Sequence, residues 1–211
     1  MNLATTLAER TPLPNAVTLA AIDFLVGRSK RKIAQSALTE EAFVAAMSDY
    51  PIAVHAAAAN AQHYEIPDRF FGLILGARRK YSCCLYPSDS ITLDEAEVLA
   101  LEETCRHADL KDGQTILELG CGWGSLSLYM AETYPNARII SVSNSHSQRD
   151  HIERQAILRK LTNLTVLTAD MNDFTTHLMF DRIVSVEMFE HMSNWRELLA
   201  RARTWLKANG A

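Results

Sequence analysis

The sequence lacks several features that would each define a class of protein. No apolar run approaches the roughly 20 residues of a membrane-spanning helix. The first residues, MNLATTLAERTPLP, lack the charged start and long apolar core of a secretory signal peptide. The formal net charge is −4, which argues against a nucleic-acid-binding protein, since such proteins usually carry a basic surface. We therefore expect a cytoplasmic protein that does not bind nucleic acid.

Cysteine is scarce, and its spacing excludes the common cysteine-based sites. Cys83, Cys84, Cys105 and Cys121 form no CxxC pair and have no zinc-site spacing. The histidines likewise show no metal-ligand spacing, and those at positions 107, 146, 151 and 177 are expected at the surface. We expect reduced thiols and no bound metal.

The first 91 residues are expected to form a helical N-terminal extension. Apolar spacing predicts helices over 16–27, 40–47, 52–64 and 68–77. A basic cluster at 28–32 indicates either a solvated helix end or a contact with a lipid surface or an anionic substrate. A longer helix follows over 92–108, where Thr92 and Glu95 have the spacing of a capping box.

Residues 92–211 alternate between strand and helix patterns. Short apolar runs predict strands over 115–119, 137–143, 164–169 and 180–186, with helices over 125–134, 145–160 and 194–207 between and after them. Such alternation implies an α/β fold with a Rossmann-like parallel sheet. These strands are continuously apolar, as expected for strands buried on both faces.

Three glycines lie directly after the first strand, in LELGCGWGSLSL. Gly120, Gly122 and Gly124 fall at the turn into the following helix, where open α/β sheets bind ligands. Missing Cβ atoms let a ligand approach the backbone, and the helix N-terminus favours an anionic group. Glu118 stands two residues before the first glycine, and this E-x-G-x-G-x-G pattern resembles motif I of class I S-adenosylmethionine (SAM)-dependent methyltransferases rather than the dinucleotide fingerprint.

Four longer segments narrow the resemblance to one family. They are HYEIPDRFFGLILGARRKYSCCLYP, ILELGCGWG, NSHSQ and FDRIVSVEMFEHMSNW. Together they resemble the family of cyclopropane-fatty-acid synthases and coclaurine N-methyltransferases, over roughly residues 55 to 210. The resemblance implies a class I methyltransferase core over 92–211, with SAM as cofactor, and an extension over 1–91 that contributes to the cofactor and substrate lid.

The resemblance also implies where SAM binds. Tyr81 and Ser82 would contact its methionine end, and Glu118 with the three glycines would form the main cradle. Many class I methyltransferases end the second strand with an acidic residue that holds the ribose hydroxyls. Here Ser143 and Asn144 stand at that place, and Asn144 with Gln148 would supply polar contacts instead. Asp170 would accept a hydrogen bond from the adenine amino group, and Met171 would pack on the ring.

An acid–imidazole cluster follows the fourth strand. In the amine branch of the family, the residues matching Glu190 and His191 act as base, and Glu187 would orient His191 or hold the substrate ammonium. In the lipid branch a bicarbonate removes the proton, held partly by residues matching Cys83 and Glu190. Glycine is more typical than Glu187 in the lipid branch, and NSHSQ is closer to the amine enzymes. We therefore favour N-methylation of a small amine, with methyl transfer to an unsaturated lipid acyl chain as the alternative.

Other questions stay open at this point. The sequence stops after four predicted strands where seven are usual, so we expect truncation or missing residues, or completion by a partner, and an apolar edge at the fourth strand. A third reading is therefore a non-catalytic protein that binds SAM or a partner. A homodimer and a peripheral membrane contact also stay open.

Overall fold

The computed structural model describes residues 14–35, 39–54 and 67–211. The chain divides into two compact units, Met1–Ala46 and Met47–Ala211. In the described parts of the first unit, α2 runs over Asn15–Gln35 and α3 over Glu40–Ala46. The helix predicted over 16–27 is therefore longer than expected and includes the basic cluster, and none of its residues is buried.

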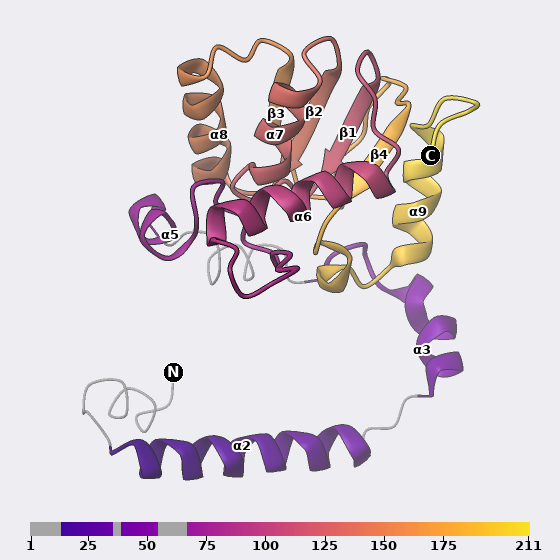
Figure 1. Cartoon of the computed structure of the whole chain (residues 1–211). Coiled ribbons are helices and arrows are strands. Elements are labelled where there is room, and N and C mark those ends of the chain that lie inside the picture. The colour runs from indigo at the N-terminus through magenta and orange to yellow at the C-terminus, as the bar shows by residue number, and fades with distance from the viewer. Residues whose placement is uncertain (1–13, 36–38, 55–66) are drawn as a thin grey trace. The chain divides into compact units, whose positions relative to one another are not determined.

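The second unit contains an open parallel sheet, as predicted. Strands β1 (Thr115–Leu119), β2 (Arg138–Ser143), β3 (Leu164–Thr168) and β4 (Arg182–Ser185) have the order β3-β2-β1-β4 (Figure 1). All three pairings are parallel. The helices are α5 (Asp68–Ile74), α6 (Leu93–His107), α7 (Ser125–Thr133), α8 (His146–Leu158) and α9 (Trp195–Thr204), with short 3-10 turns η1 (Met47–Asp49) and η2 (Phe189–His191).

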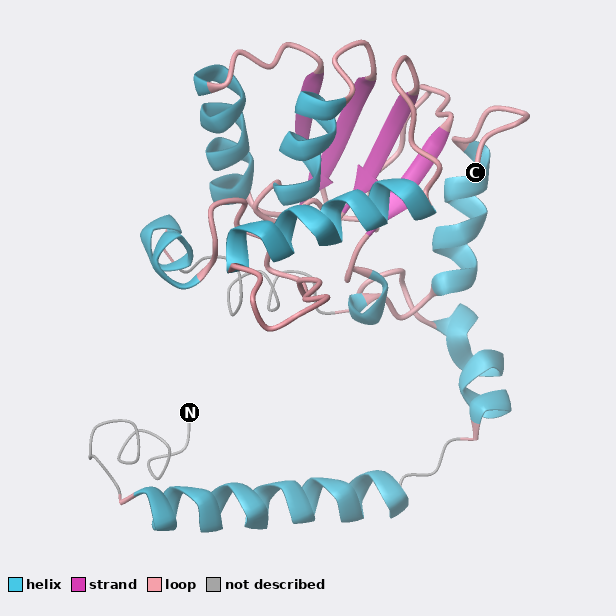
Figure 2. Cartoon of the chain, in the orientation of Figure 1, coloured by secondary structure: helices cyan, strands magenta, loops and turns pink. Residues whose placement is uncertain are grey.

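Helices cover both faces of this sheet because both faces of its strands are apolar. Leu117 and Leu119 of β1 belong to a core with Leu198 of α9, while Ile116 points into a second core with Leu101 of α6. Figure 2 shows the strands as a layer with α6 and α7 in front. The alternation along β1 therefore fixes which helix lies on which face.

The predicted helix ends agree with the structure in one case and differ from it in others. Thr92 caps α6, and its capping box with Glu95 is present as predicted. The helix predicted over 68–77 ends at Ile74 instead, and Gly76 lies beyond it. Backbone N–H groups after Gly76 donate to carboxylates of α6, so tertiary contacts end this helix early. Of the helix predicted over 52–64, residues 52–54 are not helical, and the rest lies outside the described residues.

The edge at β4 is less bare than expected. β4 is an edge strand of the sheet. The segment after α9 runs beside the start of this strand, where Phe180 donates to the carbonyl of Trp205 at 2.8 Å and accepts from Lys207 at 2.9 Å. Ile183 also donates to the carbonyl of Ala211 at 2.9 Å. These hydrogen bonds satisfy part of an edge that would otherwise offer its backbone groups to another strand.

Candidate active site

A cavity of about 620 Å³ lies at the carboxyl ends of the four strands. Each strand is followed, within two residues of its end, by a residue of the cavity wall: Gly120 after β1, Asn144 after β2, Asp170 after β3 and Glu187 after β4. Parallel strands end at the same edge of a sheet, so loops far apart in the sequence meet there. All the residues predicted for cofactor or catalysis line this cavity except Gly124 and Cys83.

Glycine is required at the three positions of the loop for different structural reasons. All have positive φ angles, at 79°, 52° and 81° for Gly120, Gly122 and Gly124, a region that favours glycine. A Cβ at Gly120 would lie 2.8 Å from Cβ of Met188, and one at Gly124 would lie 2.4 Å from Cγ1 of Ile152. A Cβ at Gly122 would meet nothing within 4 Å. The expectation of three bare ligand-facing positions is therefore corrected: Gly122 faces open space, while Gly120 and Gly124 are small because neighbouring side chains pack against them.

Two polar side chains within the glycine segment were not predicted as site residues. Trp123 Nε1 and Ser125 Oγ are buried, and both residues line the cavity. Neither atom has a hydrogen-bond partner among the described residues. Ser125 is the first residue of α7, whose N-terminus carries a partial positive charge. Buried donors without partners are rare in proteins, and a ligand satisfies them where a cavity adjoins. The signal was in the sequence, within GWGS, but which side chains would lack partners depends on the packing.

Gln148 is held so that its donor group remains unpaired. Ser143 Oγ donates to Gln148 Oε1 at 2.6 Å, and Gln148 is 2% exposed. Its Nε2 has no hydrogen-bond partner, and the residue lines the cavity together with Asn144. Asn144 and Gln148, which were predicted to supply polar contacts after β2, therefore both lie on the cavity wall.

Glu118 is a buried acid that ties β1 to its neighbours. Its Oε2 accepts hydrogen bonds from Ser127 Oγ of α7 at 2.5 Å and from Ser141 Oγ of β2 at 2.8 Å. Burial raises the pKa of Glu118, although both hydroxyls oppose the shift. Glu118 also lines the cavity, so it combines a structural tie with a polar surface for a ligand.

Asp170 and Met171 lie on the wall after β3. Asp170 Oδ1 accepts from the backbone N–H of Asn172 at 2.8 Å, which fixes the turn. The Asn172 side chain in turn accepts a hydrogen bond from the backbone N–H of Ala53 at 3.0 Å and donates one to its carbonyl oxygen at 2.9 Å. Met171 is buried at 7% exposure in the core beneath. The turn after β3 therefore also holds Ala53 and Val54 against the cavity, which both line.

The segment 78–83 is fixed by one acid of α6. Glu97 is fully buried and accepts from the backbone N–H groups of Arg78 at 2.8 Å and Lys80 at 2.9 Å. Tyr81 and Ser82, which the resemblance assigned to the methionine end of SAM, line the cavity. The structure does not bring Cys83 to the wall: its side chain is exposed, and its carbonyl accepts from Lys80 Nζ at 2.8 Å.

The same cavity is lined by the acid–imidazole cluster of Glu187, Glu190 and His191, which lies far from the glycine loop in sequence. Glu187, two residues after the end of β4, has a φ of 52°, a strained conformation for a residue other than glycine. The 3-10 turn that carries Glu190 and His191 is fixed by Trp195 Nε1, which donates to the carbonyl of Phe189 at 2.8 Å. The sheet therefore brings the acid–imidazole cluster and the glycine loop to one cavity, as the sequence predicted.

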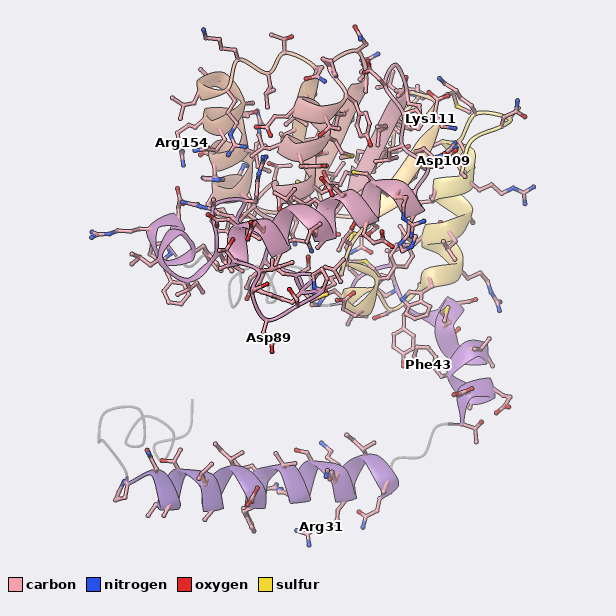
Figure 3. The ribbon with its side chains drawn as sticks, in the orientation of Figure 1. Arg31, Phe43, Asp89, Asp109, Lys111 and Arg154 are labelled. Carbon is pink, nitrogen blue, oxygen red and sulfur yellow. The ribbon has the colours of Figure 1, made fainter. Side chains whose placement is uncertain are left out.

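His151 was expected at the surface and is instead buried. Its Nδ1 lies 3.1 Å from Arg79 Nη1 and 3.6 Å from Asp68 Oδ2, and its ring meets Trp123 edge-on at 5.6 Å. Burial and the nearby Arg79 charge lower the pKa of His151 to about 4, against the opposing charge of Asp68. Asp68 also pairs with Arg79 and with Arg154, which is labelled on α8 in Figure 3. This network links α5 to α8, and His151 within it packs against the Trp123 ring.

Two absences apply to the described part of the chain. Within residues 14–35, 39–54 and 67–211, no three His, Cys, Asp or Glu side chains are grouped as a metal site would need. Over the same ranges, no helix is both long enough and apolar enough to cross a bilayer. The absence of a bound metal stays a prediction.

The geometry defines a class of protein: an open parallel α/β sheet with a ligand cavity at the carboxyl ends of its strands. A family model described as mycolic acid cyclopropane synthetase matches residues 53–211. The chain belongs to this family. The fold expected from the sequence, that of a class I SAM-dependent methyltransferase, is confirmed by solved relatives of both branches.

Both branches of the family are among the relatives. An (S)-coclaurine N-methyltransferase of Thalictrum flavum subsp. glaucum is 46% identical over 152 residues, covering 71% of this chain and 41% of that protein. Cyclopropane mycolic acid synthase 1 of Mycobacterium tuberculosis is 34% identical over 140 residues, covering 65% of this chain and 48% of that protein. The chain therefore spans less than half the length of these curated relatives.

Solved structures give the same picture. Coclaurine N-methyltransferase bound to N-methylheliamine and SAH has a TM-score of 0.77 and 36% identity, covering 90% of this chain and 57% of that one. A mycolic acid cyclopropane synthase complexed with SAH and CTAB has a TM-score of 0.67 and 29% identity, covering 74% of this chain and 55% of that one.

Proposed function

We propose that this chain carries the cofactor-binding core of a SAM-dependent methyltransferase that methylates the nitrogen of a small amine. The observation that carries the proposal is that one cavity wall joins a glycine loop with unpaired donors to the group Glu187, Glu190 and His191. The named relatives at 46% and 42% identity are N-methyltransferases of coclaurine and of tetrahydroprotoberberine.

The residues present fit SAM. Three buried donors on the cavity wall lack partners: Gln148 Nε2, Trp123 Nε1 and Ser125 Oγ. A nucleoside with ribose hydroxyls and a methionine carboxylate offers acceptors for such groups. Gly122 leaves the backbone open beside them. We propose that Asn144 and Gln148 hold the ribose, Asp170 and Met171 the adenine, and Tyr81 and Ser82 the methionine end, with Glu118, Gly120 and Gly122 as the cradle.

SAM, when bound, supplies a methyl group on a positively charged sulfur. The chain must then align an amine with that methyl and exclude water. An aliphatic amine has a pKa near 10, so about 4 kcal/mol is needed to free its lone pair at pH 7. We propose that Glu190 and His191 accept this proton as a base, and that Glu187 orients His191 or holds the ammonium.

One structural observation disfavours methyl transfer to a lipid acyl chain. Cys83, which would help to hold a bicarbonate in that chemistry, is exposed and lies outside the cavity wall. Glu187 stands where the lipid enzymes more typically have glycine. Methyl transfer to an unsaturated acyl chain therefore remains the second candidate, supported by the cyclopropane synthase relatives.

The first 91 residues also contribute to the proposed cofactor site. Ala53, Val54 and the segment 79–82 line the cavity and belong to this part of the sequence. This supports the proposal that the helical extension takes part in cofactor and substrate binding.

Calorimetry with SAM, followed by a mass-shift screen, tests the proposal. The purified chain is titrated with SAM and separately with NAD, then incubated with SAM and either a panel of cyclic secondary and tertiary amines or unsaturated phospholipid vesicles. We expect SAM binding, no NAD binding, and a gain of one methyl mass on an amine. A product only on phospholipid would transfer the proposal to the lipid branch. SAM binding without any product would identify a non-catalytic SAM-binding protein.

A further inference from the structure

Lys80 is a buried lysine whose ammonium group hydrogen-bonds neutral partners in the described part of the chain. It is 8% exposed and lines the cavity. Its Nζ donates to Ser82 Oγ and, at 2.8 Å, to the carbonyl oxygen of Cys83. Across the described ranges 14–35, 39–54 and 67–211, no carboxylate lies within the 4.0 Å ion-pair distance of Nζ. A buried ammonium without a negative partner is unfavourable, so this arrangement points to a negative partner beyond the described residues.

The position of Lys80 is fixed by its neighbours. Its backbone N–H donates to Glu97 Oε1 at 2.9 Å, and the preceding residue, Arg79, has a φ of 51°. With the backbone held at Glu97 and Nζ held at Ser82 and Cys83, the ammonium has little freedom to leave the cavity wall. Glu97 itself is occupied by backbone N–H groups on both oxygens.

The other permanent cation on the described wall is already paired. Arg79 forms an ion pair with Asp68, and its guanidinium lies 5.7 Å from the Trp123 ring centre. Lys80 therefore differs from Arg79 in having only neutral partners. A ligand group that satisfies it must be an anion.

Ser82 completes a site for such an anion. Its oxygen accepts from Lys80, which leaves the hydroxyl proton to donate to a ligand in the cavity. Independent evidence for a ligand comes from Ser125 Oγ and Trp123 Nε1 on the same wall, both buried and without partners. Charge-assisted hydrogen bonds of this kind suit a carboxylate.

We propose that Lys80 supplies the positive charge that pairs with the carboxylate at the methionine end of SAM, together with the hydroxyl of Ser82. This inference rests on the proposed function and extends it by a residue that the sequence analysis did not select. It makes the amino-acid end of the cofactor, and not only its nucleoside, a determinant of affinity.

The test compares SAM with decarboxylated SAM, which lacks only this carboxylate. Dissociation constants for both are measured by calorimetry on the wild-type chain and on Lys80→Met, Lys80→Arg and Lys111→Met. Lys111 is the matched control, since it is exposed and forms an ion pair with Asp109. Both residues are labelled in Figure 3. We expect the wild type to bind SAM at least tenfold more tightly than decarboxylated SAM.

In Lys80→Met we expect the SAM dissociation constant to rise at least tenfold, while that for decarboxylated SAM changes less than about threefold. Lys80→Arg should retain most of the preference, and Lys111→Met all of it. Equal affinity of the wild type for the two ligands would overturn the inference without any variant. An equal loss of both ligands in a Lys80→Met protein with an unchanged melting temperature would also overturn it. Failure of the wild type to bind SAM at all would instead refute the proposed function.

Discussion

Ser143 Oγ donates a 2.6 Å hydrogen bond to Gln148 Oε1, and this contact leaves the Nε2 of Gln148 buried and unpartnered beside the cavity. The two residues stand on either side of the turn from β2 into α8. A carboxamide held by its oxygen presents its N–H groups in one fixed direction. The pair thus prepares a donor for a ligand before the ligand binds.

Gln148→Met should weaken SAM binding about tenfold, because one hydrogen bond contributes roughly 0.5–1.5 kcal/mol. Ser143→Ala should weaken it less, since the carboxamide remains but can rotate. Calorimetry measures both. Gln155→Met is the control on the same helix, because Gln155 bonds Arg159 and lies outside the cavity wall. An unchanged affinity in Gln148→Met would exclude Nε2 as a ligand-binding group.

The glycines should separate binding from folding. A side chain at Gly122 would project into the open space where we propose that SAM binds, so Gly122→Val should abolish SAM binding. The positive φ at this position should also lower the free energy of unfolding by about 1–3 kcal/mol. Gly124→Ala should lower the free energy of unfolding further, because its Cβ would overlap Ile152 and overpacking adds about 1–3 kcal/mol. Thermal melts and SAM titrations of each variant give the two quantities. Gly27→Ala in α2, with nothing within 4 Å, should leave SAM binding unchanged.

Glu190→Gln should reduce turnover of the amine at least tenfold and change the SAM dissociation constant less than twofold. The carboxamide keeps the size of the side chain but cannot accept the amine proton, and general bases contribute roughly 100-fold or more. Single-turnover rates and calorimetry separate the two effects. Glu197→Gln, an exposed acid of α9 that pairs with Arg201, is the control. Parallel losses of binding and turnover would show instead that Glu190 belongs to the cofactor site.

His151 should make the protein less stable in mild acid. Its pKa in the folded state is lowered to about 4 from 6.5, so between these values the unfolded chain binds more protons. Stability therefore falls as pH falls from 6.5 to 4, by at most about 3 kcal/mol. Urea unfolding at pH 7.0, 5.5 and 4.5 measures this.

His151→Gln should show a smaller loss across the same window, and His107→Gln, at an exposed site, the same loss as the wild type. Asp68 of the same network does not confuse this result. Burial opposes a low pKa for Asp68, but Arg79 lowers it below 3.8, so its contribution is lost only in stronger acid. Equal pH dependence in His151→Gln and the wild type would contradict the assignment.

The sheet could be predicted because each strand is a short apolar run between turn residues. TILEL, between Gly113 and Gly120, was predicted to the residue. The first helix and the helix after Pro67 were predicted with wrong lengths. Their ends depend on contacts absent from a local pattern, such as the carboxylates of Asp94 and Glu97 that capture the backbone after Gly76.

The candidate site could be located from the sequence because parallel strands end at one edge, so residues after each strand must meet. What the pattern could not supply was the state of each polar group. His151 looks like a surface histidine in an otherwise polar helix, yet α5 and Arg79 bury it. Lys80 gave no signal of its own in the sequence.

The sequence by itself determined the parallel sheet, the family and the edge of the sheet at which the cavity lies, because the hydrophobic period, the alternation of strands and helices and the glycine spacing are local or nearly local properties. Only the tertiary structure decided which glycine faces open space, which donors lack partners and which buried cation lacks a counter-charge. These depend on side chains brought together from segments as far apart as Lys80 and Gln148, and no local pattern encodes that packing.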